Sequence, residues 1–383
     1  MRLLSMAWSA TTARLGQNTK AGLLGLLDGS VCFSYLLGTP LTVWYSAVLT
    51  GKILLLIRYG GSKTNFLHII PFILLITLAL VHTAVREGGD SSETINIAGF
   101  ILSLTITVLI LRYHDVEDYL YFIAFLGIAA AATYLLLATV GLIPDHYGRL
   151  LFFGGNHPNL GGEIFAISII AASISFKRIA FLAGWIIFTS AIFLMQARAA
   201  LLLALVSIGL YLWKDLQKNS QHKITLIAIT LISIGTLALA NWDSLLARID
   251  HAFLISDTNR GLGTGFVGRE ERWSQALTLF YENPLAGGGF AAFDKHGMLT
   301  PHNYFLAGLS YMGMLAVLMF AYLSYCLCRI YKTNREFLLY FAPLLILMAF
   351  NDRFLNMNPY PFTAYVAVLA MSARAKRERV FNG

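Results

Sequence analysis

The chain has 383 residues, of which 57% are hydrophobic and only 13% are charged. Soluble domains carry roughly 25% charged residues, so this composition excludes an ordinary soluble fold. The net charge of +8 comes from basic residues scattered in short segments between apolar runs, which argues against nucleic acid as a partner. Apolar runs of roughly 20 residues recur along the chain and predict an all-α, polytopic membrane protein.

Residues 1–20 lack the sustained apolar core of a signal peptide, so we predict that they form a cytoplasmic arm ahead of the first helix. About twelve transmembrane helices follow. The one long polar stretch among them is 242–302, so we expect a single transmembrane domain over residues 1–383 with one large loop inserted. The candidate helices are 21–37, 40–58, 66–84, 93–112, 118–142, 160–176, 178–195, 199–213, 223–241, 303–328, 336–351 and 358–373.

The distribution of lysine and arginine sets the orientation of these helices. With both termini in the cytoplasm, the inner segments hold eighteen basic residues and the short outer segments hold four. The positive-inside rule favours this arrangement, and long loops are exempt from it. Arg198, the 242–302 loop and the turn Asn156-His157-Pro158-Asn159 therefore all face outwards.

Part of the long loop has the pattern of an amphipathic helix. Trp273, Ala276, Leu277 and Phe280 recur at i, i+3, i+4 and i+7, which predicts a helix lying against the membrane face. The glycine-rich run 261–265 ahead of it indicates a hinge or a flexible tip.

Two arginines at the start of this helix are candidates for anion binding. Arg269 and Arg272 follow Gly268, and helix N-termini and guanidinium groups both bind phosphate well. The competing interpretation is a solvated helix face on which the arginines pair with Glu270 and Glu271.

Arg198 and His302 stand at outer membrane boundaries. Arg198 carries positive charge on the face where such charge is scarce, which indicates an anionic partner, although an interfacial anchor also explains it. His302 lies between Pro301 and Asn303, where the chain re-enters the membrane, and an imidazole can take a proton from a hydroxyl near neutral pH. The alternative for His302 is a structural role.

The last candidate element is the run Gly287-Gly288-Gly289. These residues either let backbone amides approach a diphosphate or form a tight turn into the membrane. The sequence has no ATPase-type phosphate loop, no outer acidic pair for a divalent cation, and no cysteine spacing of the zinc-site kind. We therefore expect no metal and no cofactor, with arginines neutralising a bound diphosphate.

The order and the shared outer face of these motifs resemble the O-antigen ligase superfamily, polytopic bacterial membrane proteins that include O-antigen ligases and polysaccharide polymerases. The likeness covers about residues 150 to 320 in motifs and the whole chain in topology. One departure is His157, inserted where the family often has Asn-Pro-Asn. The matching elements are Asn156–Asn159, Arg198-Ala199-Ala200-Leu201, Gly268-Arg269 with Trp273, Asn283-Pro284-Leu285, Gly287-Gly288-Gly289-Phe290 and His302-Asn303-Tyr304.

The resemblance implies a metal-independent glycosyltransferase that moves a glycan from undecaprenyl diphosphate to lipid A–core oligosaccharide. It would act among the membrane lipids at the periplasmic face of the bacterial inner membrane. By this likeness Arg198 and Arg269 bind the diphosphate, and His302 is the catalytic base. The substrate-binding residues expected around them are Arg272, Asn156, Asn159, Gly288, Gly289 and Asn303.

Three other functions compete with this one. A polymerase of the same superfamily uses the same donor but a second lipid-linked repeat as acceptor, and a glycoprotein-directed oligosaccharyltransferase is a further relative. A lipid-linked glycan transporter also suits twelve helices, but it would be expected to have ionisable residues mid-span and matched halves. Here charged residues lie mainly at span ends. Asp352 and Arg353, at an outer helix end, are expected either to form a structural salt bridge with each other or to line one outward-facing cavity with the candidate site residues.

Overall fold

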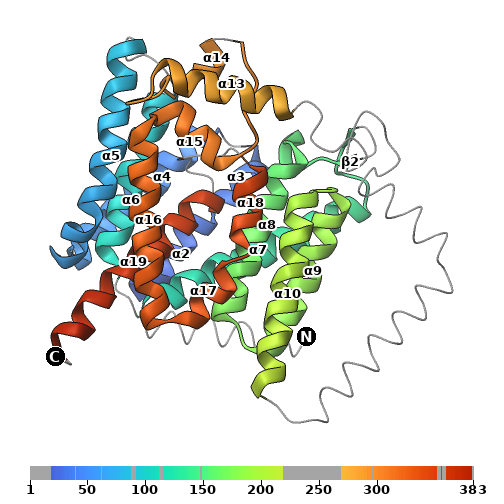
Figure 1. Ribbon diagram of the computed structural model, residues 1–383. Coiled ribbons are helices and arrows are strands. Elements are labelled where there is room, and N and C mark those ends of the chain that lie inside the picture. The colour runs from blue at the N-terminus through green and yellow to red at the C-terminus, as the bar shows by residue number, and fades with distance from the viewer. Residues whose placement is uncertain are drawn as a thin grey trace.

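The structure of the chain, a computed structural model, is helical almost throughout its described residues (Figure 1). The only sheet among these residues is a two-residue antiparallel pair, β1 (Asp145–His146) with β2 (Arg149–Leu150). The predicted all-α class is therefore confirmed. The described residues are 19–38, 40–61, 63–87, 92–111, 115–146, 149–218, 269–290, 292–295, 297–351, 355 and 359–381.

Long helices form one bundle, and short helices connect them or cover its ends. In chain order, the helices and one 3-10 turn are α2 (Thr19–Gly29), α3 (Val31–Leu37), α4 (Leu41–Tyr59), α5 (Lys63–Glu87), α6 (Ser92–Ile110), α7 (Val116–Thr139), η2 (Phe153–Gly155), α8 (Pro158–Ser175), α9 (Arg178–Leu194), α10 (Arg198–Lys218), α13 (Arg269–Glu282), α14 (Ala292–Lys295), α15 (Tyr304–Met312), α16 (Met314–Thr333), α17 (Arg335–Phe341), α18 (Leu344–Phe350) and α19 (Pro359–Phe381).

Six stretches of the described residues are long and apolar enough to cross a membrane, and three shorter apolar helices accompany them. The chain is therefore a multi-pass membrane protein, while the count of twelve spans stays a prediction. The predicted span 223–241 lies outside the described residues, as do Asp352, Arg353 and residues 242–268 of the loop. The six stretches are Lys20–Leu37, Leu41–Tyr59, Asn65–Val85, Val116–Thr139, Pro158–Ser175 and Met314–Thr333.

Two predicted spans are wrong as single helices because the chain breaks inside them. Residues 303–328 divide into α15 and α16 at Gly313, which has a left-handed φ of 58°. A Cβ there would lie 2.5 Å from the carbonyl oxygen of Pro284, so only glycine fits. Residues 336–351 divide into α17 and α18 at Pro343, which has no amide donor for a continuous helix.

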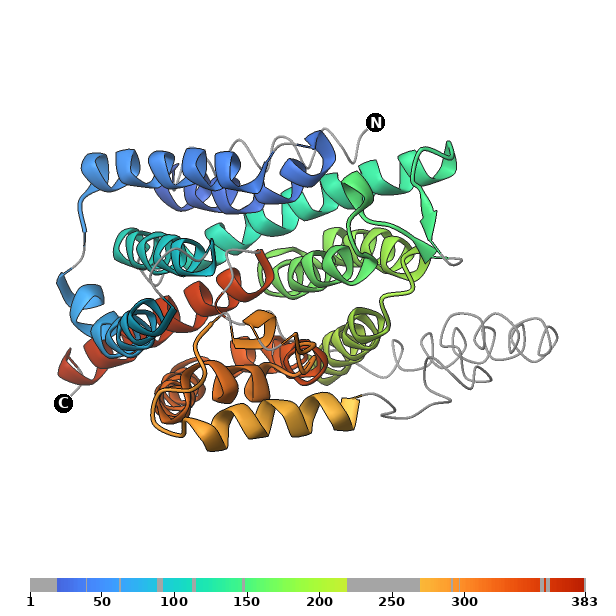
Figure 2. The same ribbon diagram turned by 90° about the horizontal axis from the view of Figure 1, so that it is seen from above.

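The helices present two distinct ends. Figure 1 shows α13 and α14 lying across one end, above α15, while α17 lies toward the other. We call the first the site end: it carries α13, the Pro301–Asn303 turn and the first residues of α8 and α10. At the opposite end, Lys214 of α10 forms an ion pair with Glu336 of α17. Seen from above in Figure 2, α13 lies along one side of the bundle and α4 along the opposite side.

The helices differ in how much of their surface is buried, and α8 and α4 are the two extremes among the six membrane-spanning stretches. The α8 stretch is 89% buried and the α4 stretch only 17%, so α8 forms the centre and α4 exposes its apolar side chains to lipid. Small residues let α7 approach α8 closely: a Cβ on Gly127 would lie 2.2 Å from the Ser168 hydroxyl oxygen. The centre of the bundle is therefore a rigid support for the turns at its ends.

A buried ion pair ties four helices together inside the bundle. Lys52 Nζ in α4 lies 2.5 Å from Asp28 Oδ1 in α2 and donates to Ser103 Oγ in α6 at 2.7 Å. The Tyr119 hydroxyl in α7 donates to Asp28 Oδ2 at 2.9 Å. Charges in apolar surroundings need such partners. The pair is an exception to the expected placement of charges at span ends.

Candidate active site at one end of the bundle

The predicted amphipathic helix is present as α13, and its apolar side packs on protein. Ala276 and Leu279 are buried in a small cluster with Ala292 and Phe293 of α14. Tyr311 of α15 packs against the same cluster. These contacts fix α13 to the bundle, so its first turn has a defined position. Its expected placement against the membrane face stays a prediction.

A hydrogen-bonded turn holds His302 next to α13. The Trp273 indole N–H donates to the Pro301 carbonyl oxygen at 2.9 Å. On the other side of His302, Asn303 Oδ1 accepts the amides that begin α15, and Asn303 Nδ2 donates to the Ala349 carbonyl oxygen at 3.3 Å. The turn that carries the candidate base is therefore fixed from both sides, by α13 and by α18.

The backbone of His302 is strained. Its φ of 47° is left-handed, a conformation that costs a non-glycine residue roughly 1–2 kcal/mol. Such residues persist where their surroundings hold them, and they cluster at active sites. The backbone thus favours a functional role for His302 over a purely structural one, and the role as base stays a prediction.

Arg269 lies in the first turn of α13, against the end of α18. Its guanidinium carbon is 5.2 Å from the centre of the Phe350 ring. Burial lowers the pKa of Arg269, and the positive charge of Arg272 lowers it further. Among the residues that the structure describes, neither arginine forms a salt bridge with Glu270, Glu271 or any other carboxylate. The two guanidinium groups at the start of α13 are therefore not held by a carboxylate of the described chain.

Arg198 is the first residue of α10. The first turn of α10 lies at the same end of the bundle (Figure 1). α10 packs along α18, the helix whose last residue, Phe350, contacts Arg269. The fold thus brings the elements that carry Arg198, Arg269 and His302 to one end. We predict that the three side chains converge on a single cavity that opens sideways to lipid.

The turn ahead of α8 explains the inserted histidine. His157 Nδ1 accepts the amide of Asn159 at 3.2 Å, so His157 is the N-cap of α8, and Pro158 takes the first helical position. Asn156 Nδ2 donates to the Phe153 carbonyl oxygen at 2.6 Å and closes the turn. A substrate contact by Asn156 or Asn159 stays a prediction.

The three glycines after α13 form a tight turn against α15. The amides of Gly288 and Gly289 donate to the carbonyl oxygens of Ser310 and Tyr311 at 2.7 and 3.2 Å. A Cβ on Gly287 would lie 2.4 Å from the backbone of Tyr311. Because these amides are already occupied, the structure favours the tight turn over an anion nest, and Gly288 and Gly289 are not part of the site proposed below.

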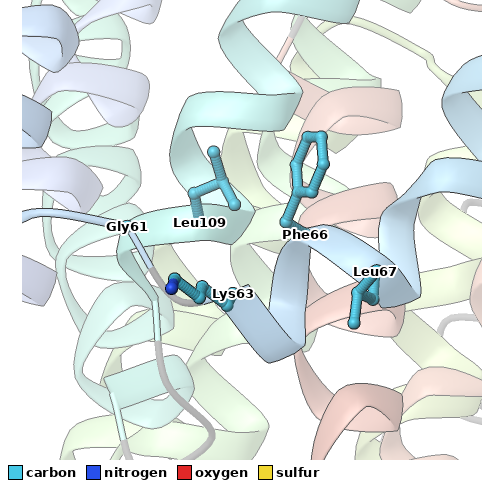
Figure 3. Close-up of a pocket in the computed structure, with 5 residues that line it drawn as sticks. All are labelled: Gly61, Lys63, Phe66, Leu67 and Leu109. Carbon is cyan, nitrogen blue, oxygen red and sulfur yellow. The ribbon is translucent and has the colours of Figure 1, made fainter.

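A hollow of about 410 Å³ lies at the start of α5 (Figure 3). One lysine and four apolar or glycine residues offer no combination of base and anion clamp, so this hollow is not the candidate active site. Its lining residues are Gly61, Lys63, Phe66, Leu67 and Leu109.

The fold is that of a helical membrane protein, and the residues Arg198, Arg269 and His302 make one end of it the candidate site. Residues 179–321 match the family model described as O-Antigen ligase, which confirms the predicted O-antigen ligase superfamily on the part of the chain from α9 into α16. No curated protein and no solved structure matches the chain. The matched stretch contains every predicted site residue except Asn156 and Asn159.

Proposed function

We propose that the chain is an O-antigen ligase-like glycosyltransferase that moves a glycan from undecaprenyl diphosphate to lipid A–core oligosaccharide. The family match supports an enzyme of the ligase or polymerase type. The proposed active site is the site end of the bundle. The positive-inside rule supports placing this end at the periplasmic face of the bacterial inner membrane, with both termini in the cytoplasm.

One observation carries the proposal: Arg269 and Arg272 lack a carboxylate partner in the described chain and stand beside the fixed turn of His302. A diphosphate is the anion that two guanidinium groups at a helix start suit best. A histidine next to it provides a candidate general base. Glycosyl transfer from a lipid diphosphate requires stabilisation of the departing diphosphate and removal of a proton from the acceptor hydroxyl.

In the proposed reaction, an acceptor hydroxyl gives its proton to His302 while its oxygen attacks the anomeric carbon of the donor sugar. The bond between that carbon and the diphosphate oxygen breaks, and undecaprenyl diphosphate leaves. Arg269 and Arg198 stabilise the charge on the departing diphosphate, a type of contact whose loss costs roughly 3–4 kcal/mol in the barrier. Attack from the face opposite the leaving group inverts the anomeric centre.

The second candidate is a polysaccharide polymerase, which the family match favours equally. A transfer assay with purified protein, lipid-diphosphate-linked glycan and EDTA separates the two. Lipid A–core is present in one tube and omitted from the other. Glycan on lipid A–core supports the ligase, and lengthened donor-linked glycan in both tubes supports the polymerase. Each tube is also run without EDTA. Transfer that occurs without EDTA and stops when it is added contradicts a metal-independent site, and a folded protein that shows no transfer even without EDTA contradicts both functions.

Replacing Trp273 by phenylalanine is expected to keep the packing of α13 and to remove the hydrogen bond to Pro301. Stability should fall by about 1 kcal/mol, the net contribution of one hydrogen bond. The transfer rate should fall by more than this loss predicts, because the turn of His302 loses one of its two supports. Thermal unfolding and the transfer assay measure the two effects. Trp213→Phe, at an exposed position of α10, is the matched control, and an unchanged rate in Trp273→Phe contradicts the positioning role.

A further inference from the structure

Hydrogen bonds between α5 and α6 fix the walls of the hollow at the start of α5. Asn65 Nδ2, in the first turn of α5, donates to the carbonyl oxygens of Val108 and Leu111 at 2.9 and 2.6 Å. These bonds hold the end of α6, whose Leu109 lines the hollow. On the other side, a Cβ on Gly61 would lie 3.7 Å from Leu109 Cβ, so the α4–α5 connection closes the hollow (Figure 3). The hollow is therefore a defined feature of this helix junction.

One exposed face of α5 runs from the hollow along the apolar part of the helix. It begins with a cation and continues with four apolar side chains. Its members, spaced at i, i+3, i+4, i+7 and i+11, are Lys63, Phe66, Leu67, Ile70 and Leu74. Residues with this spacing lie on one side of a helix. The face therefore has the chemical order of a phospholipid, with a charged group at one end and a strip for hydrocarbon behind it.

The length of α5 places Lys63 at a membrane boundary. Thr83 Oγ1, near the last turn of α5, accepts the Phe290 amide at 3.4 Å, so α5 ends at the site end of the bundle (Figure 1). Lys63 comes twenty residues earlier, which is roughly 30 Å of helix and about the thickness of the hydrocarbon core of a bilayer. The hollow therefore lies at the headgroup level of the opposite leaflet, the one that we predict to be cytoplasmic.

The positive charge beside the hollow is not paired within the described chain. No carboxylate among the described residues forms a salt bridge with Lys63 or with Arg58, which lies in the last turn of α4, three residues before Gly61. Asp115, in the connection after α6, is instead paired with Lys20 at 3.0 Å. A soluble anion would use this charge and leave the apolar walls empty, whereas an anionic phospholipid uses both.

We propose that this hollow binds one anionic phospholipid of the bilayer. The lipid phosphate contacts Lys63, and one acyl chain packs against Phe66 and Leu67. Arg58 adds attraction for the negative headgroup. The site lies roughly one membrane thickness from the proposed active site and does not depend on glycan transfer. Because a ligand that binds the folded state stabilises it, added anionic lipid is expected to raise the Tm of the protein in detergent.

Lipid titration of purified full-length protein in lipid-free detergent tests the proposal. The probes are phosphatidylglycerol and phosphatidylcholine with the same acyl chains, and native mass spectrometry measures the fraction of protein that holds one lipid. The wild type is expected to bind phosphatidylglycerol more tightly. Lys63→Gln should raise the Kd for phosphatidylglycerol about fivefold, as for one lysine near anionic lipid, and leave the Kd for phosphatidylcholine unchanged. Leu67→Gln should raise both Kd values, because it places a polar group against the acyl chain.

Lys332→Gln is the matched control, since it removes an exposed lysine from the last turn of α16. That turn is at the same end of the bundle, because Arg329 Nη1 lies 3.5 Å from His68 Nδ1 of α5. Both Kd values of this variant should equal those of the wild type. Equal affinities of the wild type for the two lipids overturn the site, as does an equal loss in Lys63→Gln and Lys332→Gln. An unchanged Kd in Lys63→Gln overturns the phosphate contact, and unchanged Kd values in Leu67→Gln overturn the place of the acyl chain.

Discussion

His302→Asn is expected to slow glycan transfer by about 10²- to 10⁴-fold, because the variant keeps the turn and loses the base. Asparagine accepts the left-handed backbone that His302 adopts, at φ 47°, better than alanine does. The hydrogen bonds of Pro301 and Asn303 on either side do not involve the imidazole. The Tm should therefore stay near the wild-type value while the initial rate of transfer to lipid A–core falls.

The control for this variant is His296→Asn, which changes a histidine of the same loop that no proposed step uses. Its transfer rate should equal that of the wild type. Because His302 acts on the acceptor hydroxyl, the Kd of His302→Asn for the lipid-linked donor should also remain unchanged. A His302→Asn protein that retains more than about a tenth of the wild-type rate contradicts general-base catalysis by this residue.

The sequence predicted α13 because a helix with one buried side has apolar residues at a regular spacing. The spacing of Trp273, Ala276 and Phe280 identified the helix, and the structure buries Ala276 together with Leu279. The breaks at Gly313 and Pro343 were not predicted, because apolar residues continue on both sides of each break. Hydropathy records how a segment interacts with lipid and is insensitive to backbone conformation, so it merges two short helices into one span.

The charged residues of the candidate site could be predicted from the sequence, whereas the side chains that contact them could not. Arg269 and Arg272 stand out in the sequence because they begin a helix in a chain with few charged residues. Phe350, which covers Arg269, is one more aromatic residue at the end of an apolar run and gives no signal of its own. Trp273 was recognised for its apolar ring, whereas its contribution to the His302 turn comes from the indole N–H.

Lys52→Met is expected to destabilise the fold by about 3–5 kcal/mol, the cost of leaving one charge of a buried pair alone. Methionine fills a similar volume, but Asp28 then keeps only the Tyr119 hydroxyl as a partner and Ser103 loses its donor. Unfolding by heat or denaturant in detergent measures the loss. Lys63→Met, at an exposed position in the first turn of α5, is the control and should change stability little.

The double variant Asp28→Asn, Lys52→Met is expected to recover most of that loss, because it leaves no unpaired charge in the bundle. It also tests whether the ion pair has a purely structural role. The pair belongs to α2 and α4, whereas Arg269 and His302 belong to α13 and the turn before α15. If the pair only holds helices together, the refolded site should transfer glycan at close to the wild-type rate. A stable double variant without transfer contradicts a purely structural role of the pair.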